Sequence, residues 1–350
     1  MKALTVQPGV KNSVRLEDVA DVRPGAGEAL VETIAIGICA TDRDIIAGRY
    51  GKSPPGSDRL VIGHESLGRV LEAPQSTGLT PGDLVVGIVR RPDPVPCANC
   101  AVGEWDMCVN GLYTEHGIKE LDGFCRERFA LDSKHLVRLD SSLEDVGVLV
   151  EPASVVAKAW DEIERIGRRA HWEPRRALVT GAGPVGLLAG LMAVERGLET
   201  HILDRATDGP KPGLVRDLGA VYHVGDVRAA SSHADVLVEC TGAGELFPQA
   251  LETMRPNGIV CLTGLSTGTH TVCINIGALS RDMILENHVV FGSVNANRRH
   301  YEMAVKSLAG ADRDWLGRII ARRESPDAWE RAIVRQSGDV KTVLDFRMAR

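Results

Sequence analysis

Three motifs before residue 153 contain residue types that bind metal ions. Cys39 lies in Gly-Ile-Cys-Ala-Thr-Asp (37–42), His64 and Glu65 follow a glycine, and Glu151 precedes a proline. A thiolate, an imidazole and carboxylates from separate loops are the ligands of a catalytic Zn²⁺ site that keeps one position open for water or substrate. Taken one at a time, Cys39 could equally be a small core residue, His64 the cap of a turn and Glu151 the start of a helix.

A second group of cysteines is closely spaced. Cys97 and Cys100 form a Cys-x-x-Cys pair and Cys108 adds a third thiol. This pattern is typical of a structural zinc loop. The remaining cysteines after residue 108 are scattered in apolar surroundings, and we interpret them as core residues.

The middle of the chain contains a Gly-x-Gly-x-x-Gly turn between an apolar, strand-like run (177–180) and an apolar, helix-like stretch (187–196). In that order the glycines allow a tight turn, a close approach of the backbone to a pyrophosphate, and close packing of helix on strand. The N-terminus of the following helix offers free N–H groups to phosphates. The residues predicted to bind a dinucleotide here are Gly181, Gly183, Pro184, Val185 and Gly186.

The residue that ends the next strand-like run bears on the choice of nicotinamide cofactor. Asp204 would accept hydrogen bonds from the adenosine ribose and repel a 2′-phosphate, which favours NAD. Arg205 beside it could pair with a 2′-phosphate, so we predict NAD with some tolerance of NADP. Two later turns, one beginning at Thr241-Gly242 and one at 263–266, would meet the nicotinamide half, although both could be ordinary loop turns.

Composition describes an ordinary globular protein and excludes some partners. The 350 residues are 44% apolar and 25% charged, enough for two domains, and the net charge of −6 without a basic block argues against nucleic acid. No apolar stretch could span a bilayer and the first residues run straight into a strand pattern, so neither a membrane nor a signal peptide is expected. We therefore expect a cytoplasmic protein without a disulfide framework.

The expected elements separate two kinds of region. Short β-rich runs with Pro-Gly turns predict a small antiparallel, barrel-like domain over 1–154. Alternating strands and helices over 155–296 predict a doubly wound parallel sheet, and 297–350 is expected to return to the first domain. The main expected strands are 3–6, 28–36, 67–72, 84–89, 177–180, 200–203, 221–224, 236–239, 258–262, 289–292 and 342–346, and the helices are 155–166, 184–196, 214–218, 245–254 and 300–308.

In this order the motifs resemble the medium-chain, zinc-dependent alcohol dehydrogenase superfamily over essentially the whole chain, and most of all the zinc-dependent glucose 1-dehydrogenases. The narrower resemblance rests on residues 37–43, 90–91, 114–118, 122–124, 151–152 and 292–295. It implies an α/β protein in which a Rossmann domain accompanies a GroES-like, β-rich catalytic domain.

The resemblance assigns roles to the metal-binding residues. It makes Cys39 and His64 direct ligands of a catalytic zinc ion and Glu65 a ligand that exchanges with water. Glu151 would complete the shell, directly or through water, and Asp42 would hold the second nitrogen of His64.

It also implies a substrate site and a metal in the cysteine loop. Thr41 would begin the relay that removes the hydroxyl proton, and sugar hydroxyls would be held by Glu115, Glu151 and Asn295. We place Asn295 beside the cofactor as well, although Glu115 and Asn295 could be surface loop residues. The family's loop normally has four cysteines, and here Asp93 stands where the first would fall, so either Asp93 binds the zinc or the loop has lost its metal.

The predicted activity is zinc-dependent oxidation of an aldose, with D-glucose favoured, at C1 to the lactone with hydride transfer to NAD or NADP. One alternative is oxidation of another sugar, a polyol or a secondary alcohol, because specificity depends on a few loop side chains. An alternative of another class is a non-catalytic nucleotide-binding protein. The resemblance further implies a homo-oligomer, either a dimer or a tetramer.

Overall fold

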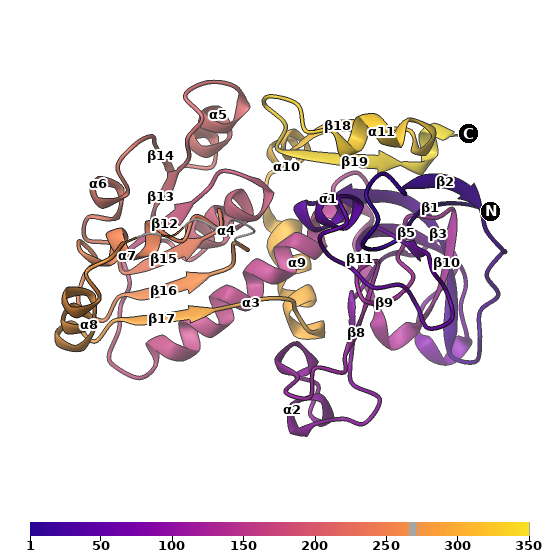
Figure 1. Cartoon of the computed structure of the whole chain (residues 1–350), viewed down its shortest axis with the longest axis horizontal. Coiled ribbons are helices and arrows are strands. Elements are labelled where there is room, and N and C mark those ends of the chain that lie inside the picture. The colour runs from indigo at the N-terminus through magenta and orange to yellow at the C-terminus, as the bar shows by residue number, and fades with distance from the viewer. Residues whose placement is uncertain (266–270, 272, 350) are drawn as a thin grey trace. The chain divides into compact units, whose positions relative to one another are not determined.

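The chain divides into two compact units in a computed structural model that describes residues 1–265, 271 and 273–349. One unit comprises Met1–Ser154 and Ala296–Arg350, and the other comprises Val155–Asn295 (Figure 1). The turn predicted at 263–266 ends outside the described residues, at Ser266. Within the described ranges, no helix combines the length and the apolar character needed to cross a membrane.

A six-stranded parallel sheet forms the middle of the unit Val155–Asn295. Its strand order is β14-β13-β12-β15-β16-β17, and each neighbouring pair is parallel. The order reverses beside β12, as in doubly wound dinucleotide-binding sheets, so the predicted α/β class is confirmed. The bounds are β12 (Arg176–Thr180), β13 (Glu199–Leu203), β14 (Val221–His223), β15 (Val236–Glu239), β16 (Ile259–Leu262) and β17 (Val289–Gly292).

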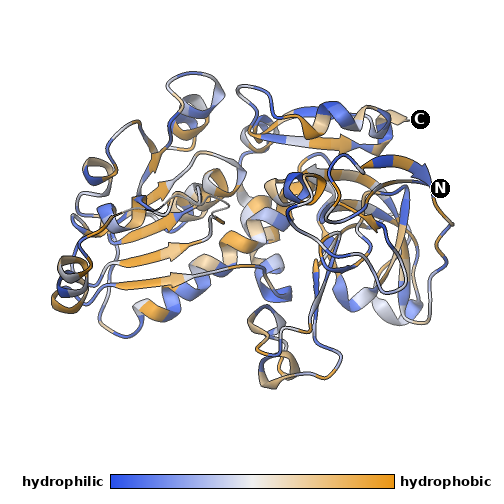
Figure 2. Ribbon diagram, viewed as in Figure 1, coloured by the Kyte–Doolittle hydropathy of each residue, from blue (hydrophilic) through white to orange (hydrophobic). Residues whose placement is uncertain are grey.

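Helices alternate with these strands. Apolar side chains of the strands form a buried core, and Figure 2 shows β15, β16 and β17 coloured as hydrophobic. The helices are α4 (Pro184–Glu195), α5 (Pro210–Asp217), α6 (Val227–Ser231), α7 (Leu246–Leu251) and α8 (Ile276–Leu285), and α3 (Val150–Gly167) begins in the other unit. Helix α8 was not expected, although Ile276, Leu279 and Met283 recur at helical spacing; none of its side chains is fully buried, and Leu279 and Met283 pack against the core while partly exposed.

The other unit is built from three sheets whose pairs are mostly antiparallel. They have the orders β2-β1-β4, β11-β6-β5-β3-β19-β18 with β10 also on β3, and β7-β8-β9. The bounds are β1 (Lys2–Val6), β2 (Arg15–Asp18), β3 (Glu28–Ile38), β4 (Leu60–Val61), β5 (Glu65–Glu72), β6 (Leu84–Gly87), β7 (Arg90–Arg91), β8 (Thr114–His116), β9 (Glu120–Leu121), β10 (Arg128–Asp132), β11 (Leu136–Leu139), β18 (Ile320–Glu324) and β19 (Lys341–Asp345).

The C-terminal segment contributes to this unit, because β19 pairs antiparallel with β3. The two sheets that contain β1 and β3 share one apolar core, which includes Phe124 and Phe129 with their rings 4.7 Å apart. The helices are α1 (Ala40–Ile46), α2 (Ala98–Ala101), α9 (Arg298–Gly310), α10 (Arg313–Ile319) and α11 (Trp329–Ile333).

Candidate zinc centre and dinucleotide site

The candidate zinc centre lies where three strand ends meet. Gly37 at the end of β3 pairs with Glu65 at the start of β5, and Thr342 of β19 pairs with Ile38. A side chain at position 37 would overlap the carboxylate of Glu65, so a glycine is required beside it. The pairing therefore gathers residues 39, 65 and 341 from segments that are distant in the sequence.

Cys39 occupies the N-cap of α1. Its Sγ accepts a hydrogen bond from the Thr41 N–H (3.2 Å), and the Asp42 carboxylate accepts one from the Cys39 N–H (2.8 Å). This reciprocal capping fixes both side chains.

His64 faces Cys39 with one ring nitrogen and Asp42 with the other. Its Nε2 lies 3.1 Å from the Cys39 Sγ, and its Nδ1 lies 3.2 Å from the Asp42 Oδ1. Both His64 and Asp42 are buried. Burial opposes a charged imidazole, but the charges of Asp42 and Cys39 hold the pKa of His64 well above its ordinary value. Asp42 thus orients the ring so that Nε2 points to the sulfur.

Glu65 forms a buried ion pair with Lys341. The contact joins the Glu65 Oε2 to the Lys341 Nζ, and the two side chains are 3% and 2% exposed. Glu151, the second residue of α3, is mostly buried. Burial and the charge of Glu65 raise the pKa of Glu151 to about 7, against the opposing effect of His64.

These residues fit a Zn²⁺ ion. One ligand atom each from Cys39, His64 and Glu65 lies within 4.8 Å of the others. A thiolate, a carboxylate and an imidazole whose far nitrogen meets a carboxylate are a donor set typical of catalytic zinc. Glu151 does not belong to this group of ligand atoms, so its coordination stays a prediction.

The structure places Glu115 in a buried ion pair rather than on the surface. The Arg90 guanidinium donates to the Glu115 Oε1 at 3.0 and 3.1 Å, and both side chains are buried. Arg90 also donates to the Asp106 carbonyl (3.2 Å) and lies 3.7 Å from the centre of the Tyr113 ring. Asn295 belongs to the other unit, where its backbone φ is +63°.

The three thiols of the cysteine loop converge. The Sγ atoms of Cys97, Cys100 and Cys108 lie within 4.8 Å of one another. Backbone N–H groups of Cys100 and Val109 lower the pKa of Cys97 to about 6, whereas burial raises the pKa of Cys100 to about 11. A thiolate at neutral pH beside two further sulfurs fits a structural zinc ion.

Asp93, predicted as the fourth ligand of that loop, is buried but does not join the three sulfurs. Its Oδ1 accepts a hydrogen bond from the Val95 N–H (2.8 Å) and its Oδ2 accepts one from the Asn110 Nδ2 (2.8 Å). Those bonds tie the carboxylate to the backbone of its own turn and to Asn110, which lies 17 residues further along the chain. Coordination by Asp93 therefore stays a prediction that requires the side chain to leave these partners.

The dinucleotide turn joins β12 to α4. Gly181 has a φ of +92°, a left-handed conformation that favours glycine, and a side chain at position 186 would come within 1.7 Å of the Gly181 carbonyl oxygen. A side chain at position 183 would meet nothing within 4 Å. Gly183 caps α4 without a side chain, and Pro184 and Val185 follow in the first turn, where the N–H groups of a helix can bind phosphate.

This difference between glycines predicts different consequences for two alanine variants. Gly186→Ala forces backbone atoms apart, so we expect it to destabilise the unit by about 3 kcal/mol or more and to weaken the cofactor site. Gly183→Ala should leave stability unchanged but lower cofactor affinity by about tenfold or more, because its methyl group would occupy the space a pyrophosphate needs. Thermal unfolding and titration with NADH distinguish the two, and equal losses of stability would contradict this interpretation.

Asp204 connects the dinucleotide turn to the chain after β13. Its Oδ2 accepts hydrogen bonds from the Ala182 N–H (2.7 Å) and the Lys211 Nζ (2.8 Å), and its Oδ1 accepts one from the Ala206 N–H (3.0 Å). Arg205 beside it is exposed. Asp204, which was predicted to bind the ribose, is thus already paired with Lys211.

A buried carboxylate organises the predicted Thr241-Gly242 turn. The Glu239 Oε1 accepts hydrogen bonds from the Thr241 N–H (2.7 Å), from the hydroxyl of Thr241 and from the Thr180 hydroxyl (3.1 Å). Its Oε2 accepts one from the Gly242 N–H (3.1 Å). The turn is therefore held rigidly at the carboxyl end of β15.

Sequence reasoning missed Lys341, Lys211 and Glu239. Lys341 meets Glu65 only through strand pairing, which no local pattern reveals. Lys211 lies between two prolines after Asp204, and an acid and a base close in the sequence could have suggested the pair. Glu239 ends an apolar strand run, where a charged residue was the available signal.

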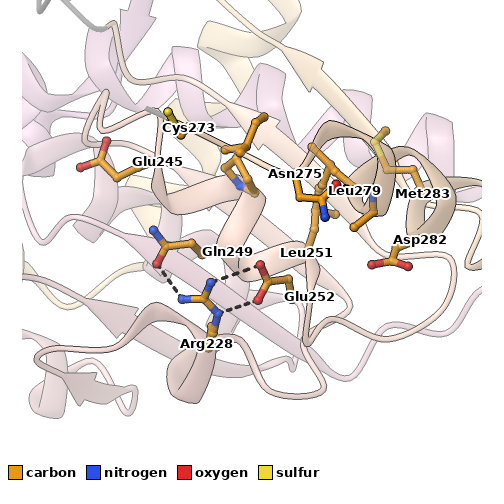
Figure 3. Close-up of a pocket in the computed structure, with 13 residues that line it drawn as sticks. Arg228, Glu245, Gln249, Leu251, Glu252, Cys273, Asn275, Leu279, Asp282 and Met283 are labelled. Atoms are coloured by element: carbon orange, nitrogen blue, oxygen red, sulfur yellow. Dashed lines mark hydrogen bonds and ion pairs between the residues drawn. The ribbon is translucent and has the colours of Figure 1, made fainter. Parts of the chain in front are cut away.

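A separate cavity of about 300 Å³ lies in the unit Val155–Asn295, between α7 and residues 273–283. Figure 3 shows the Arg228 guanidinium bonded to Glu252 and Gln249 at its rim. None of the residues that line it was predicted to bind metal, cofactor or substrate.

Two family models together cover most of the chain. Residues 25–141 match the alcohol dehydrogenase GroES-like domain, and residues 144–346 match the glucose dehydrogenase C-terminus. Glucose 1-dehydrogenase 2 of Vulcanisaeta moutnovskia is 40% identical and glucose 1-dehydrogenase of Methanocella arvoryzae is 38% identical, each over 99% of both chains.

Solved structures show the same similarity. Haloferax mediterranei glucose dehydrogenase, in complex with NADP, Zn and gluconolactone, matches with a TM-score of 0.91 and 31% identity over 99% of both chains. Because the similarity spans both units, the resemblance seen in the motifs is confirmed. The chain belongs to the medium-chain, zinc-dependent alcohol dehydrogenase superfamily and, within it, to the glucose dehydrogenase family.

Proposed function

We propose that this protein oxidises D-glucose at C1 to the lactone and transfers the hydride to NAD or NADP, with a zinc ion at the reacting oxygen. The observation that carries the proposal is the approach of the His64 Nε2 to the Cys39 Sγ at 3.1 Å, with Asp42 behind the ring. Relatives named glucose 1-dehydrogenase, and a similar structure that holds NADP, Zn and gluconolactone, support the substrate and the cofactors.

Cys39 and His64 would bind the zinc directly, Glu65 would exchange with water, and Glu151 would complete the shell. Bound zinc would supply Lewis acidity toward the C1 hydroxyl oxygen, and NAD or NADP would accept the hydride. The carboxylate of Asp42 would accept the Nδ1–H of His64 and so keep the lone pair of Nε2 available to the metal.

The substrate residues bind and deprotonate the sugar. The Thr41 hydroxyl would accept the proton of the C1 hydroxyl and pass it toward solvent. Glu115, held by Arg90, would accept hydrogen bonds from further sugar hydroxyls. Glu151 and Asn295 would bind other hydroxyls of the same sugar.

Residues 1–154 and 297–350 would form the catalytic domain, and residues 155–296 would form the dinucleotide-binding domain. The residues that we propose to bind the cofactor are Gly181, Gly183, Pro184, Val185, Gly186, Asp204, Arg205, Thr241, Gly242 and Asn295. The free N–H groups at the start of α4 would bind the pyrophosphate.

A panel of sugars and alcohols with each cofactor tests the proposal. We expect zinc-loaded protein to form NADH or NADPH fastest with D-glucose, with lactone as the product. Faster turnover of another aldose, a polyol or a secondary alcohol would favour that substrate instead. Stoichiometric zinc without reduction of either cofactor on any member of the panel would favour a non-catalytic nucleotide-binding protein.

The cysteine loop is proposed to hold a second, structural zinc ion. Cys100→Ser removes one of three convergent sulfurs, so we expect the loop's zinc to be lost and the midpoint of thermal unfolding to fall. Cys273→Ser is the matched control, because Cys273 is exposed, so its prediction as a core residue was wrong. Zinc content measured by mass spectrometry checks the result, and an unchanged content in the Cys100 variant would mean that the loop holds no metal.

Two further expectations concern the protein in the cell. We propose that it is cytoplasmic and that it forms a homodimer or homotetramer. Light scattering on the purified protein measures the second directly, and a monomer at micromolar concentration would exclude it.

A further inference from the structure

Asp204, the carboxylate predicted to bind the adenosine ribose, is not free in this structure. In the Asp204–Lys211 pair the two side chains are 12% and 13% exposed, and the N···O distance is 2.8 Å. Backbone N–H groups of Ala182 and Ala206 occupy the same carboxylate. Burial opposes its charge, but the bonds from Lys211, Ala206 and Ala182 hold the pKa of Asp204 below its ordinary value. Asp204 is therefore ionised and largely neutralised at the same time.

The position of Lys211 follows from the local backbone. It is the second residue of α5, and the helix begins at Pro210 after Gly209, whose φ is +79°. The loop before α5 is also bonded to β14, because the Tyr222 hydroxyl donates to the Ala206 carbonyl at 2.6 Å. The ammonium group is thus fixed beside the carboxylate rather than left free in solvent.

A lone carboxylate at this place repels a 2′-phosphate, whereas a cation beside it can bind one. We infer that Lys211 is the residue that lets this ribose site accept NADP, by neutralising Asp204 and by donating a further N–H of the same ammonium group to the 2′-phosphate. The inference rests on the proposed function, since it concerns the cofactor of that reaction. Exposed Arg205 is the competing cation, but no bond to Asp204 fixes its side chain among those the structure describes.

Equilibrium binding tests this without turnover. Calorimetric titration of the full chain with ADP-ribose and with 2′-phospho-ADP-ribose measures how much the 2′-phosphate contributes. In Lys211→Met we expect the affinity for 2′-phospho-ADP-ribose to fall by about 10- to 100-fold and that for ADP-ribose to change by less than about threefold, because a charged hydrogen bond is lost only in the first case. Lys211→Arg keeps the charge and should therefore retain most of the affinity for 2′-phospho-ADP-ribose.

The matched control is Arg216→Met, which removes an exposed cation from the same helix and should change both affinities by less than about threefold. Equal losses for the two ligands in Lys211→Met, or no loss for either, would overturn the inference, as would a selective loss in Arg205→Met alone. If the unaltered protein binds neither ligand, the proposed function fails instead. Circular dichroism of each variant excludes unfolding as the cause of a loss.

Discussion

Replacing Cys39 with serine is expected to lower kcat/KM for glucose by roughly a thousandfold or more, while affinity for NADH stays within about threefold. Serine is itself a good N-cap, so α1 should keep its start and Asp42 its place. What disappears is the sulfur that faces the His64 Nε2. Steady-state kinetics, zinc content and NADH titration on one preparation measure the turnover, the bound metal and the cofactor affinity of the variant.

The exposed Cys273→Ser variant is the control for a change of thiol to hydroxyl. It should match the unaltered protein in turnover and in zinc content. Equal losses of turnover and of NADH binding in the Cys39 variant would contradict the account, since they would show that the metal organises the fold rather than the reaction.

Lys341→Met is expected to cost about 3–5 kcal/mol of stability in zinc-free protein, because it leaves the Glu65 carboxylate buried without its cation. The double variant Lys341→Met with Glu65→Gln removes both charges and should recover most of the loss. Denaturant unfolding measures both values. The exposed Lys306→Met is the control and should change stability by less than about 0.5 kcal/mol. A double variant as unstable as the single one would show that the ion pair is not the cause.

The dinucleotide unit was largely predictable because its signals are local. The glycine turn, the strands before and after it and the start of α4 at Pro184 all appear as continuous patterns. Helix α5 begins at Pro210 rather than at 214, since proline fits the first turn of a helix although it breaks an interior. Helix α8 has no fully buried side chain and was not predicted, although its apolar residues Ile276, Leu279 and Met283 are spaced as on one helix face.

The zinc centre was predictable in its donors but not in its surroundings. Residue type and order were sufficient to propose Cys39 and His64, which the structure brings together. The cation that faces Glu65 arrives from β19 through strand pairing, and Arg90 reaches Glu115 across two short strands. Such partners depend on tertiary pairing, which motif spacing does not encode. The same holds for Asp93, whose sequence position suggested a ligand but whose carboxylate is bonded to the Val95 N–H and, across the loop, to the Asn110 side chain.

The most direct test of the central claim follows the hydrogen that leaves C1. Zinc-loaded protein is supplied with D-glucose deuterated at C1 and with NADP or NAD, and the reduced coenzyme is analysed by mass spectrometry. The account predicts that the deuterium appears in the coenzyme and is absent from the gluconolactone. Reduced coenzyme without deuterium, or a product that still carries it at C1, would contradict the claim that this chain oxidises glucose at C1.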